Sequence, residues 1–77
     1  MKELVEFLAK QIVDEPDAVR VSERTDDRGL LVSLKVAPDD MGKVIGKGGR
    51  TARAIRSVVR AAATRQDVHA SVEIVED

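Results

Sequence analysis

The stretch Val44-Ile45-Gly46-Lys47-Gly48-Gly49-Arg50 places three glycines in four residues between two segments with helical spacing of apolar residues. Glycines this dense end a helix because of their conformational freedom. Downstream, the apolar residues recur on one helix face and predict a helix over residues 50–65: Ile55, Val58, Val59 and Ala62. Upstream, Pro38 suits the first turn of a short helix that runs through Ile45. The sequence therefore predicts two helices joined by a glycine corner.

The segments around this corner predict one further helix and three strands. Residues 2–13 have the spacing of an amphipathic helix, and residues 19–22, 30–36 and 68–74 alternate as strands do. A turn at residues 26–29 joins the first two strands into a hairpin. The order α-β-β-α-α-β predicts an α+β fold, with a mixed three-stranded sheet and three helices packed on one face. The third strand is expected to run parallel to the second.

The composition limits the class of protein. With 77 residues the chain predicts a single domain, residues 1–77, whose core must be aliphatic because Phe7 is the only aromatic residue. The absence of cysteine excludes disulfides and zinc–thiolate sites, and no apolar run is long enough to cross a membrane. These features predict a cytoplasmic protein.

Charge is unevenly distributed along the chain. Residues 41–66 contain no acid and carry seven bases: Lys43, Lys47, Arg50, Arg53, Arg56, Arg60 and Arg65. The other residues hold all fourteen acids and six bases, so the net charge of −1 conceals one strongly positive segment. Such a segment attracts anions locally, although a solvated arginine-rich helix face would have the same composition.

The glycine corner has the features of a phosphate site. The helix that follows it has free N–H groups and a positive dipole end, and Lys47 and Arg50 add charge. A tight corner that needs glycine only for its geometry is the alternative. The spacing matches neither the P-loop nor the dinucleotide fingerprint, which argues against mononucleotide binding.

Other polar residues give no sign of catalysis. Asp39 and Asp40 stand at a helix start, where a dipole or capping role is more natural than acid–base chemistry. His69 is the only histidine and is expected to be exposed. No nucleophile and base can be paired, so the sequence predicts a protein that is not an enzyme, with no cofactor and no metal.

Residues 44–49 resemble the I-G-x-x-G loop of KH domains, and the order of elements resembles the type II, prokaryotic form. A single domain of this size is similar to the small bacterial RNA-binding proteins of the KhpA family. The resemblance implies that residues 46–49 are the GxxG loop, which clamps a nucleic-acid backbone. Val44 and Ile45 would then place the preceding helix against the groove. Ala52 departs from the isoleucine that many KH domains carry at this point.

The resemblance and the charge pattern together predict how single-stranded RNA would bind. The RNA would lie between the helix pair and the strand over residues 30–36. The RNA-binding residues would be Lys43, Val44, Ile45, Gly46, Lys47, Gly48, Gly49, Arg50 and Arg53. Bases would contact aliphatic surface that includes Val44, Ile45 and Ala52, because the chain has no aromatic stacking platform. Arg53, Arg56 and Arg60 would either extend this path or form a solvated or partner-binding face.

The resemblance also implies partners and a cellular role. It implies self-association as a homodimer, or pairing with a larger KH-containing protein of the KhpB (Jag/EloR) type. An RNA-chaperone or post-transcriptional role, linked to cell shape and cell-wall homeostasis, would follow. Two alternatives remain open: a protein-interaction module with a KH fold and little RNA affinity, and a single-stranded DNA binder.

Overall fold

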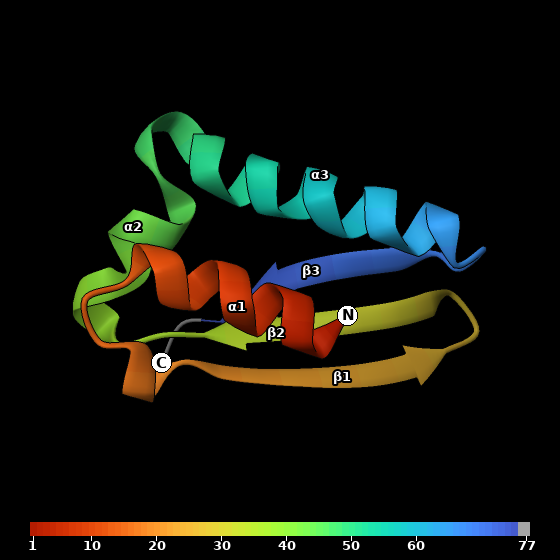
Figure 1. Ribbon diagram of the computed structural model, residues 1–77, viewed down its shortest axis with the longest axis horizontal. Coiled ribbons are helices and arrows are strands. Elements are labelled where there is room, and N and C mark those ends of the chain that lie inside the picture. Colours follow the sequence, from red (N-terminus) through yellow and green to blue (C-terminus); the bar gives the residue numbers. More distant parts are fainter. Residues whose placement is uncertain (76–77) are drawn as a thin grey trace.

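The computed structural model describes residues 1–75, and it has the predicted order of elements (Figure 1). The helices and strands are α1 (Lys2–Ile12), β1 (Arg20–Asp26), β2 (Gly29–Lys35), α2 (Met41–Ile45), α3 (Arg50–Arg65) and β3 (Ala70–Ile74). Single turns of 3-10 helix stand at Pro16–Ala18, Pro38–Asp40 and Lys47–Gly49. Residues 76 and 77 of the predicted domain lie outside the described residues. Within residues 1–75, no helix has the length and hydropathy of a membrane span.

The three strands form one mixed sheet in the order β1-β2-β3, which confirms the predicted fold class. β1 and β2 are antiparallel, whereas β2 and β3 are parallel. The hairpin is closed by the Asp26–Gly29 pair, and the Asp26 carboxylate accepts a 2.8 Å hydrogen bond from the N–H of Arg28. β1 is longer than predicted, because pairing with β2 continues through charged residues that have no apolar alternation.

The core is aliphatic and lies between the helices and one face of the sheet. Val32 and Leu34 of β2 are fully buried at its centre, and Ala70 and Val72 of β3 extend it. The helices cover these strands with short side chains: Val5 and Ala9 from α1, Val44 from α2, and Ala52, Ile55, Val59 and Ala63 from α3. The opposite face of the sheet carries polar and half-exposed residues, as expected for a two-layer domain.

The structure corrects the capping role predicted for Asp40. Its side chain forms no cap on α2, and the residue is only 1% exposed. Instead its two carboxylate oxygens accept hydrogen bonds from the backbone N–H groups of Asp14 and Glu15. The carboxylate therefore ties the segment after α1 to the start of α2, and a long-range contact has replaced the expected local one.

The arrangement of α3 and the sheet also corrects the expected groove. β2 is the central strand, with β1 on one side and β3 on the other. In Figure 1, α3 runs along β3, and residues of the two elements are in contact. The open strand edge beside the helix pair therefore belongs to β3 (Ala70–Ile74) and not to the strand over residues 30–36.

Candidate nucleic-acid interface

The glycine corner is a tight left-handed turn between α2 and α3. Gly46 has φ 76° and ψ 171°, a conformation that is essentially restricted to glycine. A Cβ atom at Gly46 would lie 2.3 Å from the hydroxyl oxygen of Thr51, so space as well as backbone angle excludes a side chain. Gly48 and Gly49 also have positive φ, but open space surrounds both. Gly46 therefore holds the corner together, whereas Gly48 and Gly49 leave its outer surface bare.

The corner leads directly into the N-terminus of α3. Gly49 is the N-cap, no side chain caps the helix, and its first turn contains no acidic residue. The N–H groups of Gly49 and Arg50 donate to the carbonyls of Gly46 and Lys47, so the N–H groups available to a ligand at the positive end of the helix dipole are the others of this turn. Lys47 and Arg50 are both exposed beside them. This is the arrangement in which helix N-termini bind phosphate groups.

Lys43 is less available than the sequence suggested. Its ammonium forms an ion pair with the carboxylate of Asp14, a residue on the segment that follows α1. The hydrogen bond that the ammonium donates to this carboxylate raises the pKa of Lys43 above its ordinary value of 10.5. The charge of Lys43 is thus partly neutralised within the protein, whereas Lys47 forms no ion pair with any residue in the range 1–75.

Arg53 lies against the glycine corner. Its Nη2 atom donates a 3.2 Å hydrogen bond to the carbonyl oxygen of Gly48, five residues earlier. The hydrogen bond holds the positive charge of the Arg53 guanidinium next to the loop. The structure therefore places the predicted residues Lys47, Arg50 and Arg53 around a single turn.

Arg56 follows on the same side of α3 and reaches the sheet. It is half-buried, and its Nε atom donates a 3.4 Å hydrogen bond to the carbonyl oxygen of Val72 in β3. In the sequence, Arg56 belongs to a row of arginines that would either extend an RNA path or form a solvated or partner-binding face. A helical wheel separates these arginines from the apolar stripe, but it does not show that a strand edge lies beside them.

The other side of α3 faces α1. A small apolar hollow of about 140 Å³ lies between these helices and is lined by Leu8, Ile12, Thr51, Ala54, Ile55 and Val58. The arginine side of α3 is therefore the β3 side. Arg53 contacts the loop at one end of this side, and Arg56 contacts the strand edge further along.

The edge of β3 that faces away from β2 carries backbone groups that no other strand within residues 1–75 pairs with. The carbonyl of His69 accepts from Leu30, and the N–H of Val75 donates to the carbonyl of Leu34, so these positions bond to β2. Because backbone direction alternates along a strand, the N–H and C=O groups of Ala70, Val72 and Ile74 point to the opposite side. An edge of this kind can pair with another hydrogen-bonding molecule.

The expected aliphatic surface needs correction at two positions. Val44 is 0% exposed and Ala52 is 4% exposed, so both belong to the core and neither can contact a base through its side chain. Ile45 is 36% exposed and provides apolar surface beside the corner. α2 and α3 are in contact with each other, and each helix buries one of these two side chains.

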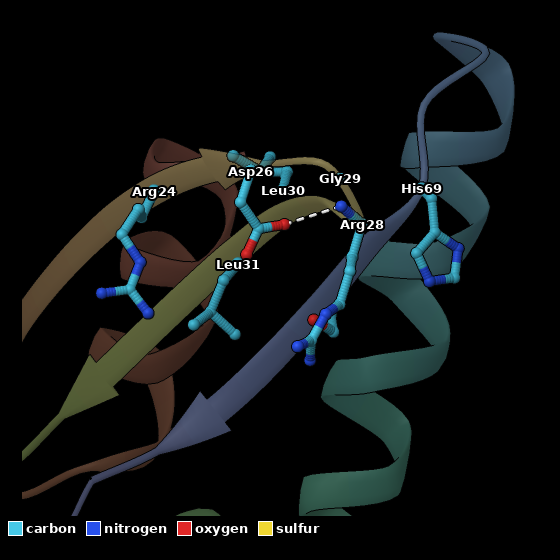
Figure 2. Close-up of a pocket in the computed structure, with 8 residues that line it drawn as sticks. Arg24, Asp26, Arg28, Gly29, Leu30, Leu31 and His69 are labelled. Atoms are coloured by element: carbon cyan, nitrogen blue, oxygen red, sulfur yellow. Dashed lines mark hydrogen bonds between the residues drawn. The ribbon is translucent and has the colours of Figure 1, made fainter.

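A larger hollow lies away from these residues. Figure 2 shows it at the hairpin end of the sheet, on the face turned away from the helices. It has a volume of about 320 Å³ and is lined by Arg24, Asp26, Arg28, Gly29, Leu30, Leu31, His69 and Ser71. His69 is exposed there, as predicted. None of the predicted RNA-binding residues lines this hollow, and among residues 1–75 no cluster of acids and histidine has the form of a metal site.

The fold resembles that of a solved structure. A crystal structure of Aquifex aeolicus Era bound to GDP·AlF4⁻ superimposes with a TM-score of 0.62 at 18% sequence identity. The match covers 95% of this chain and 28% of that one. At this identity the likeness concerns the fold alone.

Other proteins are similar to this chain in sequence over its whole length. The Clostridium acetobutylicum RNA-binding protein KhpA is 55% identical over 75 residues, which cover 97% of this chain and all of that protein. The Halalkalibacterium halodurans protein of the same name is 58% identical over 76 residues, with 99% and 100% covered. The family model described as "KhpA/KhpB, KH domain" matches residues 2–74. The chain therefore belongs to the KhpA/KhpB family of KH domains.

Proposed function

We propose that this protein binds single-stranded RNA through the loop at residues 46–49 and along the surface between α3 and the open edge of β3. The observation that carries the proposal is the uncapped, acid-free N-terminus of α3, which follows a glycine corner and has Lys47, Arg50 and Arg53 around it. Its relatives are named RNA-binding proteins, which supports the choice of RNA as the anion. A binding module without catalytic chemistry accounts for these features.

In the proposed mechanism, the phosphates and the bases of the RNA contact different groups of the protein. Loop amides together with Lys47 and Arg50 hold the phosphates, and Arg53 adds a donor fork at the same turn. Bases lie toward Ile45 and the β3 edge, where backbone and arginine groups meet their hydrogen-bonding edges. A clamp on about four phosphates predicts a slope near −3 for log affinity against log salt concentration, at roughly −0.7 per phosphate.

The loop is tested by the double variant Lys47→Asp/Gly48→Asp. Open space surrounds Gly48, and aspartate tolerates its left-handed backbone, so the variant is expected to fold. A fluorescent pool of short single-stranded RNAs is titrated at low and moderate salt, with circular dichroism as the folding check. We expect the wild type to bind with salt-dependent affinity and the variant to lose at least tenfold. Equal binding by both folded proteins would refute the loop mechanism.

Two alternative functions, single-stranded DNA binding and protein interaction, can be tested in the same way. DNA of the same base sequence, titrated in parallel, tests whether the groove distinguishes the 2′-hydroxyl. A chain that binds neither RNA nor DNA, yet associates with another protein, would instead be an interaction module with a KH fold.

We further propose that the protein acts as an RNA chaperone or post-transcriptional regulator in the cytoplasm, with a role in cell-shape and cell-wall homeostasis. A single groove of this size binds RNA weakly, so a second KH domain would raise the effective concentration. A second copy of this chain or a KhpB-type protein would supply it, and the family description names both KhpA and KhpB. Sedimentation of the chain alone, and mixed with a KhpB-type protein, distinguishes homodimer from heterodimer.

A further inference from the structure

The hollow at the hairpin end of the sheet lies outside the proposed RNA surface and has a basic lining. Its volume of about 320 Å³ is at the lower end of the range for small-ligand pockets, about 300–1,000 Å³. Arg24 and Arg28 line it together with one acid, Asp26, whereas the nearby acids Asp27 and Glu73 do not. The hollow therefore presents an excess of positive charge, in a chain whose net charge is −1.

The guanidinium groups of Arg24 and Arg28 have no partner among residues 1–75. Neither forms a hydrogen bond or an ion pair there, whereas Arg20 and Arg53 donate to backbone carbonyls. The Asp26 carboxylate accepts the backbone N–H of Arg28 and pairs with neither guanidinium. Both donor forks are therefore available to an anion.

The register of the sheet places the lining side chains on one face. Leu31 pairs with Arg24 of β1 and with Ser71 of β3, so these three residues form one row across the sheet. Because Val32 is fully buried and side chains alternate along a strand, the row faces away from the helices. Figure 2 shows Arg24 and Arg28 on either side of Leu31, extending in the same direction. A ligand over Leu31 therefore lies between the two arginines.

Gly29 shapes the end of the hollow next to the hairpin turn. It stands two residues before Leu31 on the same face of β2, so it leaves a gap in the row of side chains. Its φ is 123°, and a Cβ atom there would lie 2.3 Å from the carbonyl oxygen of His69. That oxygen accepts the N–H of Leu30 at 2.8 Å. Glycine thus permits the close approach that holds the exposed His69 beside the hairpin.

We propose that this hollow is a second anion site, which binds a phosphate monoester attached to a ribose. Near pH 7 such a phosphate carries a charge of about −1.5 to −2, which matches two guanidinium groups better than a singly charged diester does. Its terminal oxygens accept from the forks of Arg24 and Arg28 and from the Ser71 hydroxyl. The ribose lies over the apolar side chain of Leu31. Free nucleoside monophosphates and the 5′ ends of RNA strands both carry this group.

The experiment titrates the ¹⁵N-labelled protein with uridine 5′-monophosphate, and with uridine as the control that lacks only the phosphate. Backbone amide signals then report where the ligand binds. We expect the monophosphate to shift the amides of Gly29, Leu31 and Ser71, and uridine to leave them unchanged. None of the predicted RNA-binding residues lines the hollow, so these signals are separate from those of the loop at residues 46–49.

Substitutions of the arginines test the contacts to the phosphate. Arg24→Gln and Arg28→Gln should each weaken monophosphate binding at this site by at least about fivefold, because each removes one donor fork. Both side chains are exposed, so the variants are expected to fold. Arg65→Gln is the matched control, since it removes an exposed arginine from the end of α3, on the other side of the sheet. Its effect should stay within about twofold.

Asp26→Asn tests the sign of the charge on the ligand. The asparagine oxygen can still accept the N–H of Arg28, while the negative charge of the carboxylate is removed. Binding of the monophosphate should therefore become about threefold tighter.

The source of the phosphate is distinguished with the variant Lys47→Asp/Gly48→Asp, whose loop is altered. An RNA hexamer is titrated against it with a 5′-phosphate and with a 5′-hydroxyl. Tighter binding of the 5′-phosphorylated hexamer than of the monophosphate identifies the RNA end as the ligand, and equal binding identifies the free nucleotide.

Three results would overturn the inference: shifts confined to residues 46–50, shifts that uridine produces equally, or affinities that Arg24→Gln and Arg28→Gln leave unchanged. The proposed function is decided separately, by whether the altered loop loses RNA binding. Either proposal can therefore fail while the other stands.

Discussion

The Oδ2 atom of Asp40 lies 3.1 Å from the backbone nitrogen of Glu15, a residue 25 positions away in the sequence. Its Oδ1 atom accepts the neighbouring N–H of Asp14 at 3.2 Å. One buried carboxylate thus satisfies two backbone donors that no helix or strand would satisfy. It holds the end of α1 beside α2, the helix that leads into the glycine corner.

We expect Asp40→Ala to destabilise the fold by about 3 kcal/mol, because it leaves two backbone donors without their charged acceptor. Asp39→Ala is the matched control, since Asp39 is exposed and adjacent. Its effect should stay within about 0.5 kcal/mol. Urea denaturation of both variants measures the difference, and similar midpoints would show that the Asp40 contact contributes little.

Alanine substitutions at Gly46 and Gly42 should have opposite effects on stability. Gly46→Ala should destabilise the protein by about 2 kcal/mol and weaken RNA binding, because its backbone angles and the nearby Thr51 side chain exclude a Cβ atom. Gly42 lies within α2 with open space around it, so Gly42→Ala should stabilise by about 0.5 kcal/mol. Thermal denaturation and RNA titration of the two variants test this. The expectation fails if both alanines have the same effect.

Lys43 and Lys47 should contribute unequally to RNA binding. Lys47→Ala is expected to reduce the magnitude of the salt slope by about 0.7, whereas Lys43→Ala should change it less, because Asp14 already pairs with that ammonium. Titrations at four salt concentrations give both slopes. Equal slopes for the two variants would contradict the idea that the ion pair reduces the role of Lys43.

The Lys43–Asp14 ion pair also predicts how the stability of the protein depends on pH. Asp14 raises the pKa of Lys43 above 10.5, so any stability from the pair is fully present below that value. It is lost only as the pH rises through the raised pKa of the folded state. We therefore expect the Lys43→Ala effect on stability to be constant between about pH 6 and pH 9. A change within this interval, measured by urea denaturation, would point to another titrating group.

Ile45 and Val44 test the apolar part of the groove. Ile45→Ser should weaken RNA binding about threefold with little loss of stability, because the side chain is already partly in solvent. Val44→Ala should instead destabilise by about 2 kcal/mol, since it leaves a cavity in a fully buried site. Comparison of affinity and denaturation midpoint for each variant separates the two roles. Loss of RNA affinity in Val44→Ala at full stability would contradict the placement of Val44 in the core.

Local patterns in the sequence predicted most of the fold. The apolar spacing of residues 50–65 predicted α3 with its observed bounds, and the alternation of residues 30–36 predicted β2 to within one residue at each end. The glycine corner was predicted from composition, because no other residue type accommodates three positive φ angles so close together. These features depend on neighbours in the chain, which a sequence displays directly.

The site required the tertiary structure. The sequence by itself determined the helices, the strands, the glycine turn and the concentration of positive charge near it. Only the packing of α3 along β3 decided that Arg56 meets the Val72 carbonyl, and only the approach of α1 to α2 decided that Asp40 is buried and that Lys43 is paired. Backbone periodicity is local, whereas these contacts join residues 16 to 29 positions apart, whose proximity depends on how the whole core packs.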